Sequence, residues 1–330
     1  MKKKISLNDK FFVAGSSGMA GSSICRALKN NGYGSATKGG IILAPRKQEL
    51  NLLESKKVKE WFYKNKPTVV VLAAAKVGGI YANNNYPADF ILENIKIQTN
   101  IIEASWEIGV KRLLFLGSSC IYPKNAAQPI IEDYLLTGEL EKTNEPYALA
   151  KIAGIKLCEA LRKQYNFDAI SLMPTNLYGP GDNYHKKNSH VMASLIRKFC
   201  DAKINNEKKV TCWGTGEPMR EFLHVDDLGS AVVFCLETWD PNGINAPKDE
   251  EGNPLTHLNV GTGQDISIKE LSKKIAAFSS FNGEIFWDNN MPDGTRKKLL
   301  NVSKIETLGW KHQISLDEGI KKTISEYEKL

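Results

Sequence analysis

The sequence predicts an α/β fold built on a doubly wound parallel sheet, with a smaller α/β lobe beside it. Three observations predict it. Short apolar stretches suited to buried strands alternate with helical patterns over the first half of the chain. A glycine-rich turn follows the first of these strands, and the later part of the chain has shorter elements and longer loops. Alternation of this kind is typical of a parallel sheet with helices on both faces.

The first strand, expected at 11–14, leads into three glycines at a spacing of three and a helical pattern through residue 28. In a dinucleotide turn the first glycine allows the bend, the second lets backbone approach pyrophosphate, and the third lets helix pack on strand. The helix N-terminus then faces the negative charge. A turn without a ligand can share this pattern, but its position after the first strand favours a Rossmann-like site. The residues expected at the cofactor are Gly15, Ser16, Ser17, Gly18, Met19 and Gly21.

The second strand, expected at 41–44, has a basic end. No Asp or Glu stands there to bind a ribose 2′-hydroxyl, and Arg46 and Lys47 follow instead. Because a cationic pair suits a 2′-phosphate, the pattern favours NADP(H) over NAD(H). An ordinary basic surface loop is the alternative interpretation.

Further apolar stretches predict strands at 69–75, 112–117 and 170–174, with a helix over 88–108. Ligands on such sheets bind beyond the carboxyl ends of the strands, so the glycine turn, 73–79 and Ser118 should meet at one edge.

We therefore expect residues 1–180 to form the NADP-binding Rossmann domain, with 221–261 returning to it. Segments 181–220 and 262–330 are expected to form the substrate-binding lobe.

Tyr147 and Lys151 lie four residues apart, so on a helix they share one face. The ammonium would favour the ionised phenol and make it a better proton donor or acceptor near neutral pH. Ser118 would complete the set by hydrogen-bonding a substrate carbonyl while Tyr147 transfers the proton. A solvated helix face and a turn-capping serine are the ordinary alternatives. The shared dinucleotide context favours the catalytic interpretation.

Length and composition fit a soluble enzyme, because 330 residues of which 42% are hydrophobic can bury a large core. The net charge of +7 comes from scattered residues, and no run of basic and aromatic residues indicates nucleic-acid binding. No apolar stretch approaches the ~20 residues of a membrane span, and no signal peptide opens the chain, so we expect a cytoplasmic protein without membrane contact. Six cysteines at least twelve positions apart predict no metal site and no redox pair.

Six motifs together give the chain a resemblance to the extended short-chain dehydrogenases/reductases, and within them to the GDP-L-fucose synthases. They are AAAKVGGI at 73–80, GSSCIYPK at 117–124, NEPYALAK at 144–151, MPTNLYGP at 173–180, NSHV at 188–191 and MREFLHVDD at 219–227. The resemblance covers nearly the whole chain, and the Ser-Ser-Cys and Asn-Ser-His-Val pieces are its most specific parts. It implies a GDP-4-keto-6-deoxy-D-mannose 3,5-epimerase/4-reductase that uses NADP(H) and forms a homodimer.

Residue by residue, the resemblance implies Ser118, Tyr147 and Lys151 for reduction, and Cys120 and His190 as the acid/base pair for epimerisation. Beyond the glycine turn, it implies cofactor contacts from Arg46, Lys47, Ala73, Ala74, Ala75, Tyr147, Lys151, Pro174, Asn176, Leu177 and His190. It implies nucleotide-sugar contacts from Asn176, Lys198, Trp213, Arg220, Asp293 and Lys298.

The proposed epimerase pair also makes chemical sense. A ketone at C4 acidifies the hydrogens at C3 and C5, so a base and an acid on opposite faces of the ring can invert either carbon through an enolate. A thiolate in cationic surroundings has a lowered pKa, which suits Cys120, and the imidazole of His190 titrates near neutrality. A buried structural thiol and a helix-capping histidine are the alternatives.

Three departures from the family pattern stand out. Ser17 occupies a position where relatives carry an arginine in the glycine turn. Lys198 replaces an arginine that often lies against the substrate diphosphate, which keeps the charge and loses the bidentate fork. The stretch 32–40 resembles an insertion and is expected to form a surface loop.

Two other functions compete with the epimerase/reductase. One is another NAD(P)-dependent nucleotide-sugar epimerase or 4,6-dehydratase of the same superfamily. A dehydratase usually needs an Asp-Glu pair where Ser119 and Cys120 stand, and retained NAD usually accompanies an acid after the second strand. The other is a catalytically silent dinucleotide-binding or redox-sensing protein, against which the intact Ser118, Tyr147 and Lys151 argue.

Overall fold

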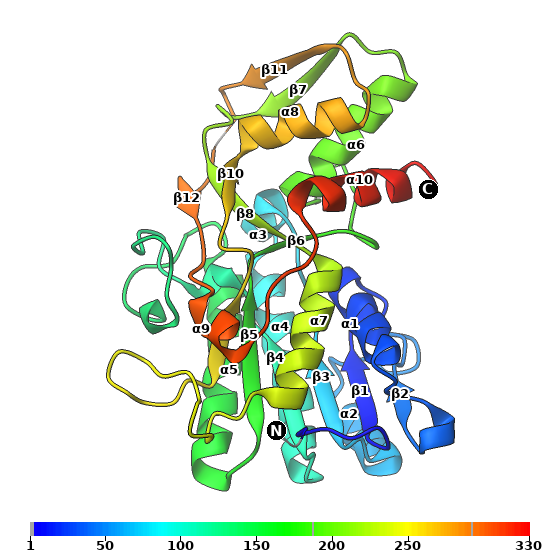
Figure 1. Cartoon of the computed structure of the whole chain (residues 1–330), viewed down its shortest axis with the longest axis vertical. Helices are drawn as coiled ribbons and strands as arrows, with labels where there is room; N and C mark the ends of the chain where they lie inside the picture. Colours follow the sequence, from blue (N-terminus) through cyan, green and yellow to red (C-terminus); the bar gives the residue numbers. More distant parts are fainter. Residues whose placement is uncertain (1–2, 187, 292) are drawn as a thin grey trace.

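The computed structural model describes residues 3–186, 188–291 and 293–330, and Figure 1 shows two stacked parts. The larger part contains a six-stranded sheet in the order β2-β1-β3-β4-β5-β9, with every neighbouring pair parallel. This confirms the expected α/β class. The strands are β1 (Lys10–Ala14), β2 (Ile41–Leu43), β3 (Val69–Leu72), β4 (Arg112–Leu116), β5 (Ala169–Pro174) and β9 (His257–Val260).

The central strands β3 and β4 are buried along their whole length because helices cover both faces of the sheet. Helices α1 and α7 pack together on one face, and α4 packs between α2 and α5 on the other. Their bounds are α1 (Met19–Asn30), α2 (Ser55–Asn65), α4 (Pro87–Glu107), α5 (Glu145–Tyr165) and α7 (Val225–Thr238). Short helices α3 (Ile80–Asn85), η1 (Ala36–Lys38), η2 (Ser119–Ile121) and η3 (Glu132–Tyr134) lie in the connections.

The smaller part is a mixed α/β lobe with its own apolar core. In it β8 (Met219–His224) pairs with β6 (Asn176–Tyr178), β10 (Asp265–Ser267) and β12 (Lys297–Lys298). A separate two-stranded parallel sheet consists of β7 (Lys209–Trp213) and β11 (Glu284–Asp288). Helices α6 (Val191–Ile204), α8 (Ile268–Phe278) and α10 (Leu316–Tyr327) pack against one another beside these strands.

The boundary between the two parts differs from the expectation in three places. Residues 176–178, expected in the Rossmann domain, form β6 and pair with β8 in the lobe. The stretch 219–224 forms β8 in the lobe, so the return to the large sheet begins with α7 and continues with β9. Residues 300–310, expected in the lobe, lie in the larger part because α9 (Ser303–Leu308) packs on β9 and the side chains of Leu300 and Ile305 join the large core. Sequence patterns miss this because the segment is short and contacts the sheet only through tertiary packing.

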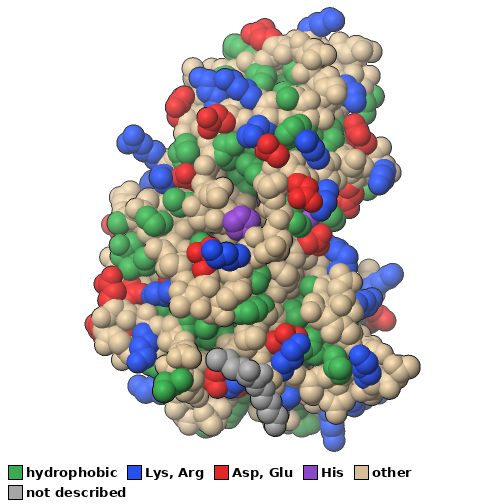
Figure 2. All heavy atoms as spheres, viewed as in Figure 1, with side chains coloured by type: hydrophobic (Ala, Val, Ile, Leu, Met, Phe, Trp, Pro, Cys, Tyr) green, Lys and Arg blue, Asp and Glu red, His purple; other side chains and the backbone are tan. Residues whose placement is uncertain are grey.

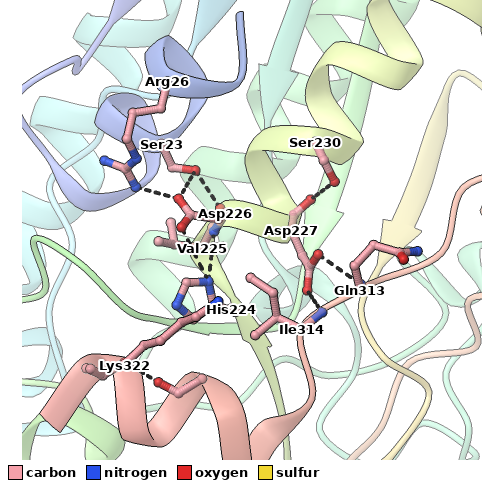
Figure 3. Close-up of polar contacts among 12 residues, drawn as sticks. Ser23, Arg26, His224, Val225, Asp226, Asp227, Ser230, Gln313, Ile314 and Lys322 are labelled. Atoms are coloured by element: carbon pink, nitrogen blue, oxygen red, sulfur yellow. Dashed lines mark hydrogen bonds and ion pairs between the residues drawn. The ribbon is translucent and has the colours of Figure 1, made fainter. Parts of the chain in front are cut away.

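Helix α7 ties the C-terminal segment to α1 (Figure 3). The carboxylate of Asp227 accepts hydrogen bonds from the backbone N–H groups of Gln313 and Ile314, at 2.9 and 3.0 Å. On the other side, the hydroxyl of Ser23 in α1 donates to the carbonyl of Val225 at 2.7 Å. These bonds fix the chain just before α10, and so anchor part of the lobe on the larger part.

Charged side chains of both signs are interspersed over the face in Figure 2, with no single basic track across it. None of the helices in the described part of the chain combines the length and apolar character that crossing a bilayer requires.

Candidate active site

A cavity of about 1110 Å³ lies between the carboxyl ends of the large sheet and the lobe. Its volume exceeds the usual range for one small ligand, so it has room for two ligands side by side. Most of the residues expected at the site line it: Gly15, Ser17, Gly18, Met19, Gly21, Lys47, Ala73, Ala74, Ala75, Ser118, Cys120, Tyr147, Lys151, Pro174, Asn176, Leu177, His190, Lys198, Trp213, Arg220, Asp293 and Lys298.

Two expected cofactor residues, Ser16 and Arg46, do not line the cavity. The hydroxyl of Ser16 turns to the carbonyl of Ala44 at 3.3 Å, which joins the glycine turn to the end of β2. The backbone N–H of Arg46 donates to Glu49 at 2.6 Å and starts a turn. Lys47 is therefore the member of the expected cationic pair that faces the cavity.

The glycine turn has the geometry of an anion site. Gly15 adopts φ +82°, and a β-carbon there would lie 2.8 Å from the backbone of Ala74. A β-carbon at Gly21 would lie 2.1 Å from the carbonyl oxygen of Gly15, so only glycine lets α1 pack this closely. No side chain caps α1 at Gly18, and no acid stands in its first turn. The free N–H groups of the helix start therefore face the cavity.

Ser118 and Tyr147 meet where β4 ends. The hydroxyl of Ser118 accepts from the backbone N–H of Cys120 at 3.2 Å, and its side chain lies near the phenol of Tyr147. Lys151 is buried below them, with its ammonium donating to the carbonyl of Leu116 at 2.7 Å. Ser118 does cap a turn, as the ordinary interpretation expects, and still lies near the phenol. The alternative of a solvated helix face is wrong, because Lys151 is buried.

The electrostatics of this set differ from the sequence expectation. Burial lowers the pKa of Lys151 to about 7, and burial together with Cys120 raises the pKa of Tyr147, which the side chain of Ser118 opposes. The nitrogen of Lys151 lies 5.9 Å from the centre of the Tyr147 ring. In the chain alone, desolvation favours the neutral form of both groups and outweighs the expected stabilisation of a phenolate.

Cys120 and His190 reach the cavity from its two sides. Cys120 lies in η2, directly after the large sheet, and its sulfur is 3.6 Å from the ammonium of Lys298. His190 is the N-cap residue of α6 in the lobe, and its imidazole makes no capping bond. Desolvation by the surrounding protein lowers the pKa of His190, although the ring remains exposed to the cavity.

The loop after β3 touches the segment that carries His190. The N–H of Gly79 donates to the carbonyl of Asn188 at 3.3 Å. The side chain of Asn94 in α4 binds both backbone groups of Lys76. Its oxygen accepts from the Lys76 N–H at 2.9 Å, and its amide nitrogen donates to the Lys76 carbonyl at 3.0 Å. The sequence pointed to this loop as a motif but could not show that it contacts the segment that carries His190.

The lobe contributes the remaining wall. The ammonium of Lys198 donates to the carbonyl of Thr211 at 2.7 Å and lies 5.6 Å from the centre of the Trp213 ring. Trp213 is 51% exposed, so it belongs to the cavity wall and not to a core. Asp293 accepts from the N–H and the hydroxyl of Thr215, at 2.8 and 2.7 Å, and thereby joins two loops at the rim.

Residues 11–246 match the profile of the family described as "NAD dependent epimerase/dehydratase family". The chain belongs to this family.

Among epimerase/dehydratase relatives, GDP-L-fucose synthase 1 of Arabidopsis thaliana is 50% identical over 97% of this chain and 93% of its own length. GDP-L-fucose synthase of Escherichia coli K12 is 50% identical over 95% of both chains. The structure of a GDP-mannoheptose C4 reductase from Campylobacter jejuni with NADP bound is 36% identical and covers 98% of this chain and 99% of its own, with a TM-score of 0.84.

Several wall residues of this epimerase/dehydratase site carry no sequence signal. They come from loops, helices and a strand that only the fold brings together, and they include Pro45, Asn51, Asn83, Thr143, Ser194 and Trp287. No spacing or motif distinguishes them from ordinary polar or apolar surface residues.

Proposed function

We propose that this chain converts GDP-4-keto-6-deoxy-D-mannose to GDP-L-fucose, as a 3,5-epimerase and an NADPH-dependent 4-reductase. Its support from relatives is the 50% identity, over nearly the full length, to GDP-L-fucose synthases of a plant and a bacterium. The observation that carries the proposal is that one cavity holds both the Ser118, Tyr147 and Lys151 set and the Cys120 and His190 pair.

The residues present fit NADP(H). The uncapped start of α1, the glycine turn and Lys47 suit a pyrophosphate and a 2′-phosphate, and the Campylobacter relative was solved with NADP. The remaining expected cofactor contacts, 73–75, Pro174, Asn176, Leu177 and His190, belong to the same proposal. When bound, the cofactor supplies the hydride for reduction.

In reduction, Tyr147 delivers a proton to the C4 oxygen while Ser118 hydrogen-bonds that oxygen. The closeness of the Ser118 side chain to the Tyr147 phenol supports this pairing. Lys151 is buried, and its ammonium donates to the carbonyl of Leu116. It supports the floor of the site below Tyr147 and adds positive charge there when it is protonated.

In epimerisation, Cys120 and His190 act on carbon-bound hydrogens. The thiolate removes the acidic hydrogen beside the C4 ketone, which leaves an enolate, and the imidazolium returns a proton to the opposite face. Their approach from the large sheet and from the lobe supports this division of roles.

Substrate binding falls to the lobe in this proposal. Lys198, Arg220 and Lys298 supply cations suited to a diphosphate, Trp213 supplies an exposed aromatic face, and Asn176 and Asp293 add polar groups. The division into a cofactor domain and a substrate lobe is part of the same proposal.

The test is to incubate the purified chain with GDP-4-keto-6-deoxy-D-mannose and NADPH, to follow the nicotinamide absorbance and to identify the product by NMR. We expect one NADPH oxidised for each GDP-L-fucose formed. A 4-epimerase or 4,6-dehydratase would turn over its substrate without net NADPH loss. A silent binding protein would neither consume the substrate nor oxidise NADPH.

A homodimer through α4 and α5 is the partner that we propose. Leu92 and Ile95 of α4 and Leu149 of α5 are exposed apolar side chains on two helices that pack side by side. Light scattering after gel filtration should give twice the 36.7 kDa chain mass, and the double change Leu92→Glu and Leu149→Glu should give monomers. A monomeric wild type would contradict the pairing.

The cytoplasm is the location that we propose. All six cysteines are free thiols, which fits a reducing compartment, and NADPH is available there.

A further inference from the structure

Glu221 of β8 is a fully buried acid that lies where the lobe joins the larger part. One of its carboxylate oxygens accepts from the backbone N–H groups of Thr262 and Gly263, which follow β9, at 2.5 and 2.8 Å. The other accepts from the N–H of Leu300, which follows β12, at 2.9 Å. A buried carboxylate that accepts several N–H bonds resists movement, because breaking any of them leaves a buried polar group unpaired.

The turn at 261–263 fits closely around this acid. A β-carbon at Gly261 would lie 2.1 Å from a carboxylate oxygen of Glu221, so only glycine lets the turn close on the side chain. Successive backbone N–H groups of such a turn form a concave site for an anion. Here the anion is a side chain of the lobe, so the Gly-Thr-Gly turn of the larger part holds the lobe strand in place.

A further connection passes through the backbone of Glu221. Its carbonyl accepts from the side-chain amide of Asn176 at 2.8 Å and from the hydroxyl of Thr175 at 3.3 Å. These two residues lead from β5 of the large sheet into β6 of the lobe. Glu221 therefore joins three passages of the chain between the two parts: from β5 to β6, from β9 to β10, and from β12 to the core residue Leu300.

These passages carry residues that we assign to the nucleotide sugar. Arg220 precedes Glu221 in β8, and the strand pairing sets Lys298 of β12 opposite Arg220. Arg220, Lys298 and Asn176 line the cavity, whereas Glu221 does not. Tyr147, on the opposite side of the proposed reaction, belongs to the larger part. The distance between the lobe contacts and Tyr147 therefore depends on how Glu221 fixes the lobe.

We propose that Glu221 is a positioning residue, which fixes the lobe on the larger part and so holds the nucleotide-sugar contacts in register with Tyr147. This rests on the proposed function, which assigns Arg220, Lys298 and Asn176 to the substrate. Glu221 touches neither substrate nor cofactor and acts through the backbone of its neighbours. Binding of NADPH should not depend on it, because the glycine turn lies within the larger part.

The test is Glu221→Gln. The amide keeps the size of the acid but has one accepting oxygen, so one set of N–H groups faces an NH₂ group instead of an acceptor. We expect the KM for GDP-4-keto-6-deoxy-D-mannose to rise about tenfold or more, while the KM for NADPH stays within about twofold of wild type. Amide hydrogen exchange should become about tenfold faster at Leu300, or at Thr262 and Gly263, whichever lose the acceptor.

Asp227→Asn is the matched control. Asp227 is also a buried carboxylate that accepts two backbone N–H bonds between the parts, but neither it nor its partners Gln313 and Ile314 line the cavity (Figure 3). This variant should lose stability and keep both KM values. Gly261→Ala displaces the Glu221 carboxylate by a second route and should raise the substrate KM as well, so it carries the test if Glu221→Gln does not fold.

Two results would overturn the proposal. One is an unchanged substrate KM in the folded variants at Glu221 and Gly261, and the other is an equal rise in Asp227→Asn. Hydrogen exchange needs no turnover, so a wild type that fails to oxidise NADPH would refute the proposed function and leave the anchor testable. Equal exchange rates in wild type and Glu221→Gln would then show that Glu221 does not hold the lobe.

Discussion

At the residue scale, each residue of the proposed site combines its proposed chemical role with a structural one. Ser118 caps η2 and contacts Tyr147, and Lys151 packs below both with a hydrogen bond to the end of β4. A substitution therefore needs to keep shape while removing one chemical property.

Tyr147→Phe meets that condition. It keeps the ring and removes the proton donor, so hydride transfer to the ketone should fall roughly 10²- to 10⁴-fold in single-turnover measurements. Tyr165→Phe, near the exposed end of the same helix, is the matched control and should be active. Near-normal reduction by Tyr147→Phe would rule out the assigned role.

Lys47 should set the cofactor preference. Because Lys47 lines the cavity and Arg46 does not, Lys47→Ala should raise the KM for NADPH by about tenfold or more and leave that for NADH nearly unchanged. Arg46→Ala should have a smaller effect. Equal losses with both cofactors would mean that Lys47 serves the fold and not the phosphate.

Lys151 should make stability depend on pH in the ligand-free protein. Its folded pKa of about 7 lies below the ordinary lysine value, so the unfolded chain binds more protons between about pH 7 and 10. The cost of burying the charge is fully present below pH 7 and is relieved as pH rises. Lys151→Met should therefore be more stable than wild type at pH 6, on the order of 2–4 kcal/mol, and the gap should narrow toward pH 10. Urea unfolding of both proteins across this pH range measures the difference in their free energies of unfolding. A difference independent of pH would contradict the lowered pKa of Lys151.

At the element scale, the contact between the β3–α3 loop and the His190 segment should matter for epimerisation. A β-carbon at Gly79 would lie 2.7 Å from the carbonyl oxygen of Ser189, so Gly79→Ala must displace the backbone that leads to His190. We expect formation of the fucose configuration to fall about tenfold or more in product analysis, with NADPH affinity retained. Unaltered epimerisation would show that the segment tolerates the shift.

At the scale of the whole molecule, the sequence predicted the features that depend on local pattern. The glycine turn, the apolar strands and the Tyr147–Lys151 spacing are each contained in a few residues, and the sheet and cavity follow from their order. The packing of 300–310 on the large sheet and the contact of Lys298 with Cys120 join segments far apart in sequence. The lowered pKa of Lys151 depends on burial, which spacing alone does not specify.

The central claim is that one cavity carries out proton exchange at carbon through Cys120 and reduction through Tyr147. The direct test is NMR of GDP-4-keto-6-deoxy-D-mannose incubated with the chain in deuterated water without NADPH. Wild type should wash deuterium into C3 and C5, and Cys120→Ser should lose most of that exchange because a hydroxyl is a far poorer base, while it still binds NADPH. If Cys120→Ser exchanges deuterium and, once NADPH is added, forms GDP-L-fucose at the wild-type rate, Cys120 is only a packed thiol and the account is wrong.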